Sequence, residues 1–334
     1  MKRRLGLALL GLMLGLVGAE IGLRCFFPRV LSARQLLDQR PAMFAPSSRL
    51  PFELLAGFRG RQRSQEFDVG VELDSHGYRG PECPNPDLLC LGDSFTFGHG
   101  VEEKQCWVSL LRRQWGRPVL NAGYHGGLYP DGFLVYLSQQ GLLLKPRVVL
   151  VALFVGNDLD DATLPPRTQD GWRGLDSEGL PTAVFDPSSE VFEGHLIRRG
   201  AWLPRVPLAR ESTLLNWLVG ERPRPRGQAI YQRPWSPRVE EKARVLQLLL
   251  RGMSRRCRLQ GATLRVVLIP QLRQLGHPEL ADPSKALGSL CRQAEVPFLD
   301  LLPVMQPADY YAGDQHWNAA GHARAARAIG AWLK

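Results

Sequence analysis

Cysteine is scarce in this sequence, and its spacing argues against the usual structural uses of the residue. The 334-residue chain holds six cysteines, at positions 25, 83, 90, 106, 257 and 291. None forms a CxxC pair, so neither a zinc site nor a dense disulfide framework is indicated. An exported chain could still form a bridge, but the spacing does not give its connectivity. Cys90 lies in an apolar run and is more typical of a small core residue than of a ligand.

Acidic residues are too few to balance the basic ones, and the chain carries a formal net charge of +10. The imbalance is concentrated in residues 196–258, which hold 15 Arg or Lys against 4 Asp or Glu. Such a surface is suited to anionic lipid headgroups or an acidic glycan. A merely solvated, arginine-rich surface explains the same count equally well. No nucleic-acid reading motif is present, so nucleic acid is not an expected partner.

The N-terminal segment, residues 1–27, has the layout of an export signal. Lys2, Arg3 and Arg4 precede an apolar run over residues 5–19, as in a Sec-type signal peptide or signal-anchor. That run is shorter than the roughly 20 residues of a membrane span, but apolar residues resume at Ile21. We expect a retained anchor with the rest of the chain outside the cytoplasm. The alternative is cleavage and a secreted or periplasmic protein.

Three further segments are distinguished by composition. Residues 28–69 are interpreted as a linker or stalk and a lead-in, and residues 70–334 as the main domain. Alternating apolar and polar positions predict a small hairpin-like element just before the core. Residues 159–235 are rich in Pro, Gly and Trp and interrupt the regular pattern. We interpret them as an insertion over the functional edge of the sheet, where substrate specificity would be determined.

From residue 87 onward, short apolar runs alternate with segments of helical period. The expected strands are DLLCLGD, RPVLNAG, PRVVLVALFVGND, ATLRVVLIP and VPFLDL, and the expected helices cover 102–115, 237–260, 282–294 and the segment capped by Asn318. This alternation predicts an α/β domain with a mainly parallel sheet and helices on both faces. Functional residues of such sheets gather at the carboxyl ends of the strands.

The stretch LLCLGDSFTFGHG places a serine at such an end. A strand that stops at Gly92 and turns into a helix exposes the Ser94 hydroxyl and brings the Ser94 N–H near a helix N-terminus. These are the requirements of a nucleophile and of an oxyanion donor.

A serine needs a base, and His316 in GDQHWNAAGH is the strongest candidate of the seven histidines. Asp314 lies two residues away and could fix the tautomer of the imidazole, which would complete a Ser94, His316 and Asp314 triad. Taken alone, a capping carboxylate and a surface histidine explain the pair better. His322 has no neighbouring acid and is interpreted as structural.

Two other loops follow expected strands. Gly126 could bring a backbone N–H close to a substrate, and the Asn157 amide could face a developing negative charge. With the Ser94 N–H they would form three oxyanion donors, each worth about 3 kcal/mol in the transition state. A tight turn at Gly126 and a turn or cap at Asn157 are the alternatives.

The order of these blocks resembles the SGNH, or GDSL, hydrolase superfamily over roughly residues 70–334. The matching residues are Gly92-Asp93-Ser94, Gly126, Gly156-Asn157-Asp158, and Asp314 with His316. The resemblance implies a flavodoxin-like three-layer α/β/α fold and ester hydrolysis or acyl transfer through an acyl-serine, with no metal or organic cofactor. The G-x-S-x-G elbow of α/β-hydrolases is absent because Thr96 occupies the second glycine position.

One departure from the commonest family spacing narrows the expected substrate. Only Gln315 separates the acid from the histidine, where two residues are usual. The D-x-H-W arrangement resembles exported SGNH-type esterases and acetyltransferases that act on bacterial polysaccharides. We therefore expect a serine esterase for a short, acetyl ester of a cell-envelope or extracellular glycan. A polysaccharide O-acetyltransferase is the alternative, followed by a non-catalytic glycan-binding module.

Overall fold

A computed structural model describes residues 2–159, 176, 180–183, 189–220 and 229–334 of the chain. Much of the expected 159–235 insertion therefore lies outside the described residues. All six cysteines lie inside them, and each is a free thiol.

The centre of the molecule is a five-stranded parallel sheet. Its strands are β5 (Leu88–Gly92), β6 (Val119–Gly123), β7 (Val148–Phe154), β10 (Thr263–Ile269) and β11 (Phe298–Asp300). Their spatial order is β6-β5-β7-β10-β11, with β5 paired in parallel to both β6 and β7. This is the 2-1-3-4-5 order of flavodoxin-like folds, in which the topological switch lies between the first and third strands. Here the switch lies between β5 and β7.

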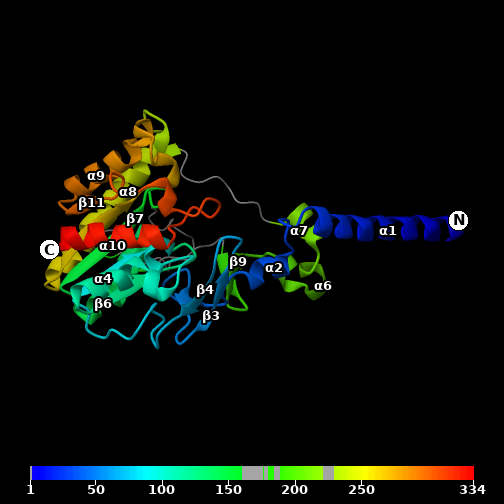
Figure 1. Cartoon of the computed structure of the whole chain (residues 1–334), viewed down its shortest axis with the longest axis horizontal. Coiled ribbons are helices and arrows are strands. Elements are labelled where there is room, and N and C mark those ends of the chain that lie inside the picture. Colours follow the sequence, from blue (N-terminus) through cyan, green and yellow to red (C-terminus); the bar gives the residue numbers. More distant parts are fainter. Residues whose placement is uncertain (1, 160–175, 177–179, 184–188, 221–228) are drawn as a thin grey trace.

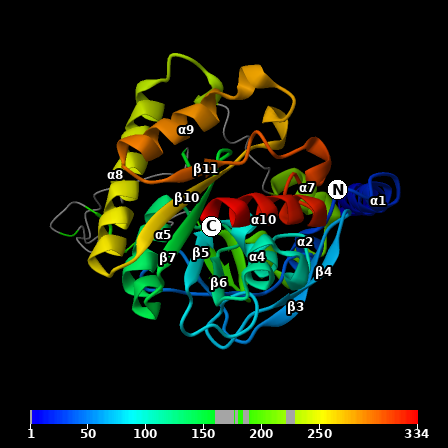
Figure 2. The same cartoon turned by 60° about the vertical axis from the view of Figure 1, so that its left-hand side comes forward.

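Helices cover both faces of this sheet (Figure 2). They are α3 (Ser94–Phe97), α4 (Trp107–Trp115), α5 (Pro130–Gln139), α8 (Pro237–Leu259), α9 (Asp282–Gln293) and α10 (Ala319–Leu333). Alternate side chains of β5 divide between two buried clusters: Leu89 and Leu91 pack with α5, α8 and α9, while Leu88 and Cys90 pack with α4 and α10. The predicted α/β class, the parallel sheet and the three-layer arrangement are confirmed.

The expected elements differ little from the observed ones. The helix expected at 102–115 is split into a 3-10 turn, Glu103–Gln105, and α4. Asn318 caps α10 as predicted, accepting hydrogen bonds from the N–H groups of Ala320 and Gly321. His322 is buried and accepts a hydrogen bond from the Trp107 N–H at 3.2 Å, so it joins α10 to the start of α4.

The segment 28–69 is folded, which differs from the linker or stalk expected there. It contains α2 (Ala33–Asp38), β1 (Phe44–Ala45), β2 (Glu53–Leu54) and β3 (Arg59–Arg63), and β3 forms a hairpin with β4 (Asp68–Glu72). Met43, Leu50 and Phe52 are almost fully buried in the cluster beneath α5 and α8. These side chains complete the core, so the segment cannot act as a free stalk.

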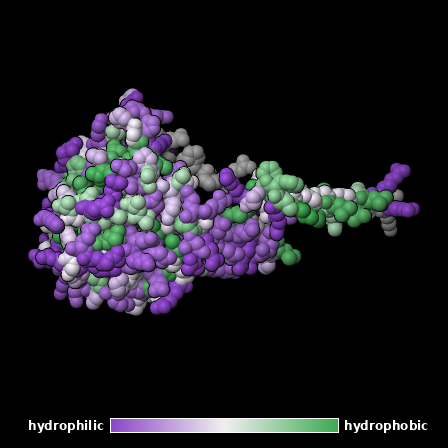
Figure 3. Space-filling model, viewed as in Figure 1, coloured by the Kyte–Doolittle hydropathy of each residue, from purple (hydrophilic) through white to green (hydrophobic). Residues whose placement is uncertain are grey.

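The N-terminal helix α1 (Lys2–Phe26) projects away from the domain (Figure 1). At its base lie α6 (Pro207–Arg210), α7 (Thr213–Val219) and the hairpin of β8 (Ser189–Phe192) and β9 (His195–Arg198). Apolar surface covers most of α1, with hydrophilic residues at its free end (Figure 3). The described part of the expected insertion is thus arranged beside α2 and the base of α1.

Candidate active site

The predicted nucleophile lies where the first sheet strand turns into a helix. β5 ends at Gly92 and α3 begins at Ser94, with the Asp93 carboxylate as the N-cap of α3. A Cβ on Gly92 would lie 2.3 Å from Thr96 Oγ1, so the close approach of strand and helix requires glycine. Burial raises the pKa of Asp93 to about 6. The turn therefore presents Ser94 at the carboxyl end of β5, beside the topological switch.

The predicted base and acid lie in one hydrogen-bonded line with this serine. His316 Nε2 is 2.7 Å from Ser94 Oγ, and His316 Nδ1 is 2.6 Å from Asp314 Oδ1. The serine and the histidine are 222 positions apart in the chain. A carboxylate bonded to the second ring nitrogen fixes the tautomer that leaves Nε2 free to accept the serine proton.

The single residue between acid and histidine is accommodated by a left-handed turn. Gln315 has a φ of 66°, and its N–H bonds to the Tyr311 carbonyl at 3.0 Å. The Tyr311 N–H in turn bonds to the His316 carbonyl at 2.8 Å. This tight turn allows Asp314 and His316 to bond to each other despite the shortened spacing. A positive φ costs energy for a residue other than glycine, and the surrounding hydrogen bonds offset it.

A second histidine, which the sequence did not single out, shares the acid. His99 Nε2 lies 3.2 Å from Asp314 Oδ2, the oxygen that His316 does not use. Burial lowers the pKa of His99 to about 4, with the neighbouring His316 charge adding to the effect. Burial alone would raise the pKa of Asp314, but hydrogen bonds from His316 and His99 outweigh it and hold that pKa far below the ordinary value. The carboxylate is therefore ionised.

A chain of polar contacts continues from His99 to His125 and Gln62. His99 Nδ1 is 2.8 Å from His125 Nε2, which is also 3.0 Å from Gln62 Nε2. Gln62 Oε1 accepts the Gly100 N–H at 2.9 Å, so the amide of Gln62 is fixed. Burial lowers the pKa of His125 well below the ordinary value. A sequence signal existed, because His99 lies between two glycines just after the helix that Ser94 begins, and His125 precedes Gly126 in the loop after β6.

A cavity of about 590 Å³ opens onto the serine and is called the catalytic cavity here. It is lined by Asp93, Ser94, Phe95, Phe154, Gly156, Asn157, Gln271, Leu272, Arg273, Asp314, Gln315 and His316. Four of the five predicted site residues thus border one space. The Asn157 side-chain amide forms no hydrogen bond with other described residues, and its buried Oδ1 is unpaired. That amide is available to a ligand in the cavity.

Gly126 is the predicted site residue that does not line the catalytic cavity. Its φ is +100°, and a Cβ there would lie 2.6 Å from Leu196 Cδ1 and 3.0 Å from Phe44 Cε1. The residue must therefore be glycine for conformational and packing reasons. Its part in oxyanion binding stays a prediction.

Two groups of side chains in the described residues have the spacing to hold a metal ion. One is His99, Asp314 and His316, and the other is Asp74, His76 and Glu82. In the first group, His316 and Asp314 bond to each other and His316 also bonds to Ser94. These residues are thus already committed to one another. The expectation of no metal or cofactor stays untested.

The chain is similar to known proteins over most of its length. A family model described as the GDSL-like Lipase/Acylhydrolase family matches residues 90–324. Among solved structures, TesA is 18% identical with a TM-score of 0.43, covering 74% of this chain and 97% of its own. A putative lipolytic G-D-S-L protein from Desulfitobacterium hafniense is 13% identical with a TM-score of 0.41, at 73% and 97% coverage.

A carbohydrate acetylesterase from Sinorhizobium meliloti is likewise 13% identical, with a TM-score of 0.39 and coverage of 74% of this chain and 97% of its own. No curated protein is significantly similar to the chain.

Proposed function

Because this chain belongs to the GDSL-like lipase/acylhydrolase family, whose members act on ester bonds, we propose that it is a serine esterase with the triad Ser94, His316 and Asp314. The observation that carries the proposal is the unbroken line of hydrogen bonds from Ser94 Oγ through His316 to Asp314, at 2.7 and 2.6 Å. This line borders a cavity of sufficient volume for an ester substrate.

The proposed reaction has two halves. Ser94 Oγ attacks the ester carbonyl carbon while His316 Nε2 takes the hydroxyl proton. The tetrahedral intermediate collapses, the C–O bond to the alcohol breaks, and His316 returns the proton to the departing alkoxide. Water then attacks the acyl-serine with His316 as base, which releases the carboxylic acid and restores Ser94. Asp314 orients the imidazole and stabilises the imidazolium.

Three donors are proposed for the oxyanion: the N–H groups of Ser94 and Gly126 and the side-chain amide of Asn157. The position of Ser94 at the N-terminus of α3 and the unpaired amide of Asn157 support this assignment. The part played by Gly126 rests on the family pattern alone.

The proposed substrate is a short acyl ester, acetyl in particular, on a cell-envelope or extracellular polysaccharide. Phe95, Phe154 and Leu272 give the catalytic cavity an apolar wall suited to a small acyl group. Gln271 and Arg273 add polar groups on the same rim, suited to sugar hydroxyls or a sugar acid.

The test uses a fluorophosphonate probe on the full chain in detergent. Labelling should occur in the wild type and disappear in Ser94→Ala and His316→Ala. Ser289→Ala, on α9, and His277→Ala, at the exposed residue just before a 3-10 turn, are the matched controls and should label normally. Persistent labelling of Ser94→Ala would refute the assignment of the nucleophile.

The same preparation separates hydrolysis from acyl transfer. With 4-nitrophenyl acetate as donor, an esterase releases acetate at a rate that an added glycan does not change. A transferase is accelerated by the glycan and yields an acetylated sugar. The acetyltransferase is the alternative that this measurement would establish.

We further propose that α1 is retained as a membrane anchor, with the catalytic domain on the extracytoplasmic side. Residues 3–26 form a helix about 36 Å long at 1.5 Å per residue, and it contains an 18-residue window of mean hydropathy 2.0, none of which is buried. That length exceeds the roughly 30 Å of a bilayer core. The basic N-terminus favours a cytoplasmic location for the first residues.

Contacts at the base of α1 support retention over cleavage. The Glu20 carboxylate accepts hydrogen bonds from the N–H groups of Thr213 and Leu214, both at 2.9 Å, and Arg24 donates to the Glu211 carbonyl at 2.6 Å. The intact mass of the protein from membranes tests this proposal. A mass that lacks residues 1–19 would establish the secreted or periplasmic alternative.

A further inference from the structure

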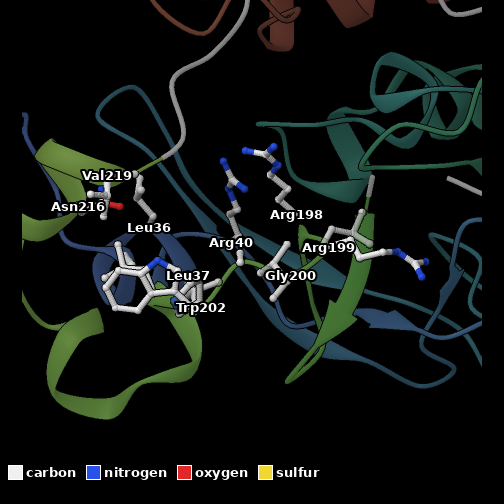
Figure 4. Close-up of a pocket in the computed structure, with 16 residues that line it drawn as sticks. Leu36, Leu37, Arg40, Arg198, Arg199, Gly200, Trp202, Asn216 and Val219 are labelled. Carbon is white, nitrogen blue, oxygen red and sulfur yellow. The ribbon is translucent and has the colours of Figure 1, made fainter. Parts of the chain in front are cut away.

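A second cavity lies on the side of the domain where α1 is attached, and it is called the anchor-side cavity here. Its volume is about 400 Å³, and it is enclosed by α2, β9, the turn after β9 and α7 (Figure 4). It shares no lining residue with the catalytic cavity. The proposed ester chemistry therefore does not account for it.

The inner wall of this cavity is apolar. Leu37, Ile197 and Leu203 line it and are less than a tenth exposed, whereas Trp202 is half exposed. Figure 4 shows the Trp202 indole beside Leu37 at one end of the cavity. Such a wall suits a hydrocarbon chain, because burial of its CH2 groups gains about 0.8 kcal/mol each.

The other end of the cavity carries positive charge without a partner. Figure 4 shows Arg40 and Arg198 extending toward the same end, while Arg199 turns away. Neither Arg40 nor Arg198 forms an ion pair within the described parts of the chain. Two guanidinium groups that face one space repel each other until an anion lies between them.

Two neighbouring arginines that do not line this cavity are paired. Arg34 bonds to Asp38 on α2, which ends two residues before Arg40, and Arg205 bonds to Glu190 close to Trp202. Arg40 and Arg198 thus differ from these two neighbours in having no carboxylate partner among the described residues.

The location favours a lipid over a free anion. A neighbouring cavity of about 440 Å³ shares Leu36, Asn216 and Gly220 with the anchor-side cavity and extends to Arg29, three residues after α1 ends. The exposed apolar residues Trp217 and Val219 border this path. A molecule in the cavity would thus be continuous with the apolar surface of α1.

We propose that the anchor-side cavity binds an anionic phospholipid of the membrane that holds α1. One acyl chain lies against the wall of Leu37, Ile197 and Leu203, and the phosphate lies between Arg40 and Arg198. The proposal rests on the proposed retention of α1, because that helix brings the cavity to the bilayer. Guanidinium groups recognise phosphate through paired N–H donors, which suits this headgroup.

The test is native mass spectrometry of the full chain, delipidated in detergent and titrated with phosphatidylglycerol or phosphatidylcholine. The wild type should retain one phosphatidylglycerol and bind phosphatidylcholine more weakly. In Arg40→Gln/Arg198→Gln the apparent Kd for phosphatidylglycerol should rise roughly 10- to 30-fold. Arg34→Gln/Arg205→Gln removes the same charge from the same region outside the cavity and should bind like the wild type.

A second measurement follows the acyl chain and does not depend on the arginines. Phosphatidylglycerol with brominated acyl chains should quench the fluorescence of the wild type more than that of Trp202→Phe. Inorganic phosphate at the same concentration should neither quench nor displace the lipid; displacement by phosphate would reduce the site to an anion site and overturn the lipid assignment. Equal affinities of the two double variants would also overturn it.

Failure of the lipid-binding proposal can be distinguished from failure of the proposed anchor or of the proposed esterase activity. Loss of residues 1–19 in the intact mass refutes the anchor, and absence of 4-nitrophenyl acetate hydrolysis refutes the esterase. The intact mass and the hydrolysis assay are measured separately, so the lipid titration decides neither the anchor nor the esterase.

Discussion

The two cavities of this molecule satisfy their charged groups in opposite ways. In the catalytic cavity the ionised Asp314 accepts hydrogen bonds from two histidines, and each histidine has a further partner. In the anchor-side cavity Arg40 and Arg198 face open space with no acid paired to them in the described residues. The first arrangement is preorganised for chemistry, and the second is prepared for a charge from outside. Substitutions in the catalytic cavity should therefore strongly lower kcat. Substitutions near the anchor-side cavity should affect only the structure around it.

The largest effect is expected at the shared acid. Asp314→Asn keeps the shape of the side chain but offers His316 an amide, which favours the wrong imidazole tautomer. We expect kcat for 4-nitrophenyl acetate to fall by about 10³- to 10⁴-fold with an unchanged circular dichroism spectrum. The exposed Asp282, paired with Lys285, provides the control variant Asp282→Asn. A loss below tenfold would mean that His316 does not depend on this acid.

The buried histidines predict a loss of stability in acid. Burial lowers the pKa of His99 to about 4 and that of His322 to about 3, and it holds the pKa of His125 well below the ordinary value. Unfolded histidines titrate near 6.5, so the unfolded state binds more protons as the pH falls from about 6.5 to 4. The free energy of unfolding must therefore decrease over this range.

Asp93 opposes this trend, because its pKa of about 6 lets the folded state keep a proton that the unfolded state has lost above about 4. His99 and His322 together outweigh this carboxyl and give a net loss on the order of 3 kcal/mol between pH 7 and 4.5, to which His125 adds. Urea unfolding at several pH values measures it. His99→Gln should flatten the dependence, whereas the exposed His76→Gln should not. A stability that is constant over this range would contradict the burial of these rings.

A smaller effect is expected at His99, which touches the acid and not the substrate. His99→Ala leaves Asp314 bonded to His316 alone, so the imidazole is less firmly oriented. We expect a kcat about tenfold lower with KM within twofold, and partial rescue in His99→Gln, whose amide can still donate to the carboxylate. A raised KM with an unchanged kcat would instead make His99 a substrate contact.

The sequence predicted the parts of this site that are local. An apolar run that ends in Gly92-Asp93-Ser94 specifies a strand, a turn and an exposed hydroxyl within seven residues, and Asn318 specifies where the last helix begins. His316 required the family pattern, because the turn at Gln315 that joins it to Asp314 has no propensity signal.

The parts that depend on distant contacts could not be predicted. His99 is 215 positions from the carboxylate that it shares, and Met43 and Phe52 show no periodicity that would mark them as core. Arg79 is buried with its guanidinium bonded to the carbonyls of Phe97 and Val101 at 3.0 and 2.5 Å, holding the loop that carries His99. An isolated arginine in a polar loop gives no indication of such a role.

The smallest predicted effect lies at the base of α1 and tests whether the two regions are independent. Glu20→Ala removes the carboxylate that accepts the first N–H groups of α7, a loss of about 1 kcal/mol for a helix cap. Amide hydrogen exchange in residues 213–219 should accelerate about fivefold, while kcat for 4-nitrophenyl acetate should stay within experimental error. Glu211→Ala, whose side chain is exposed, should change neither. If kcat falls together with the protection of α7, the anchor-side region is coupled to the triad, and the contrast between a self-contained catalytic cluster and an open lipid-facing cavity does not hold.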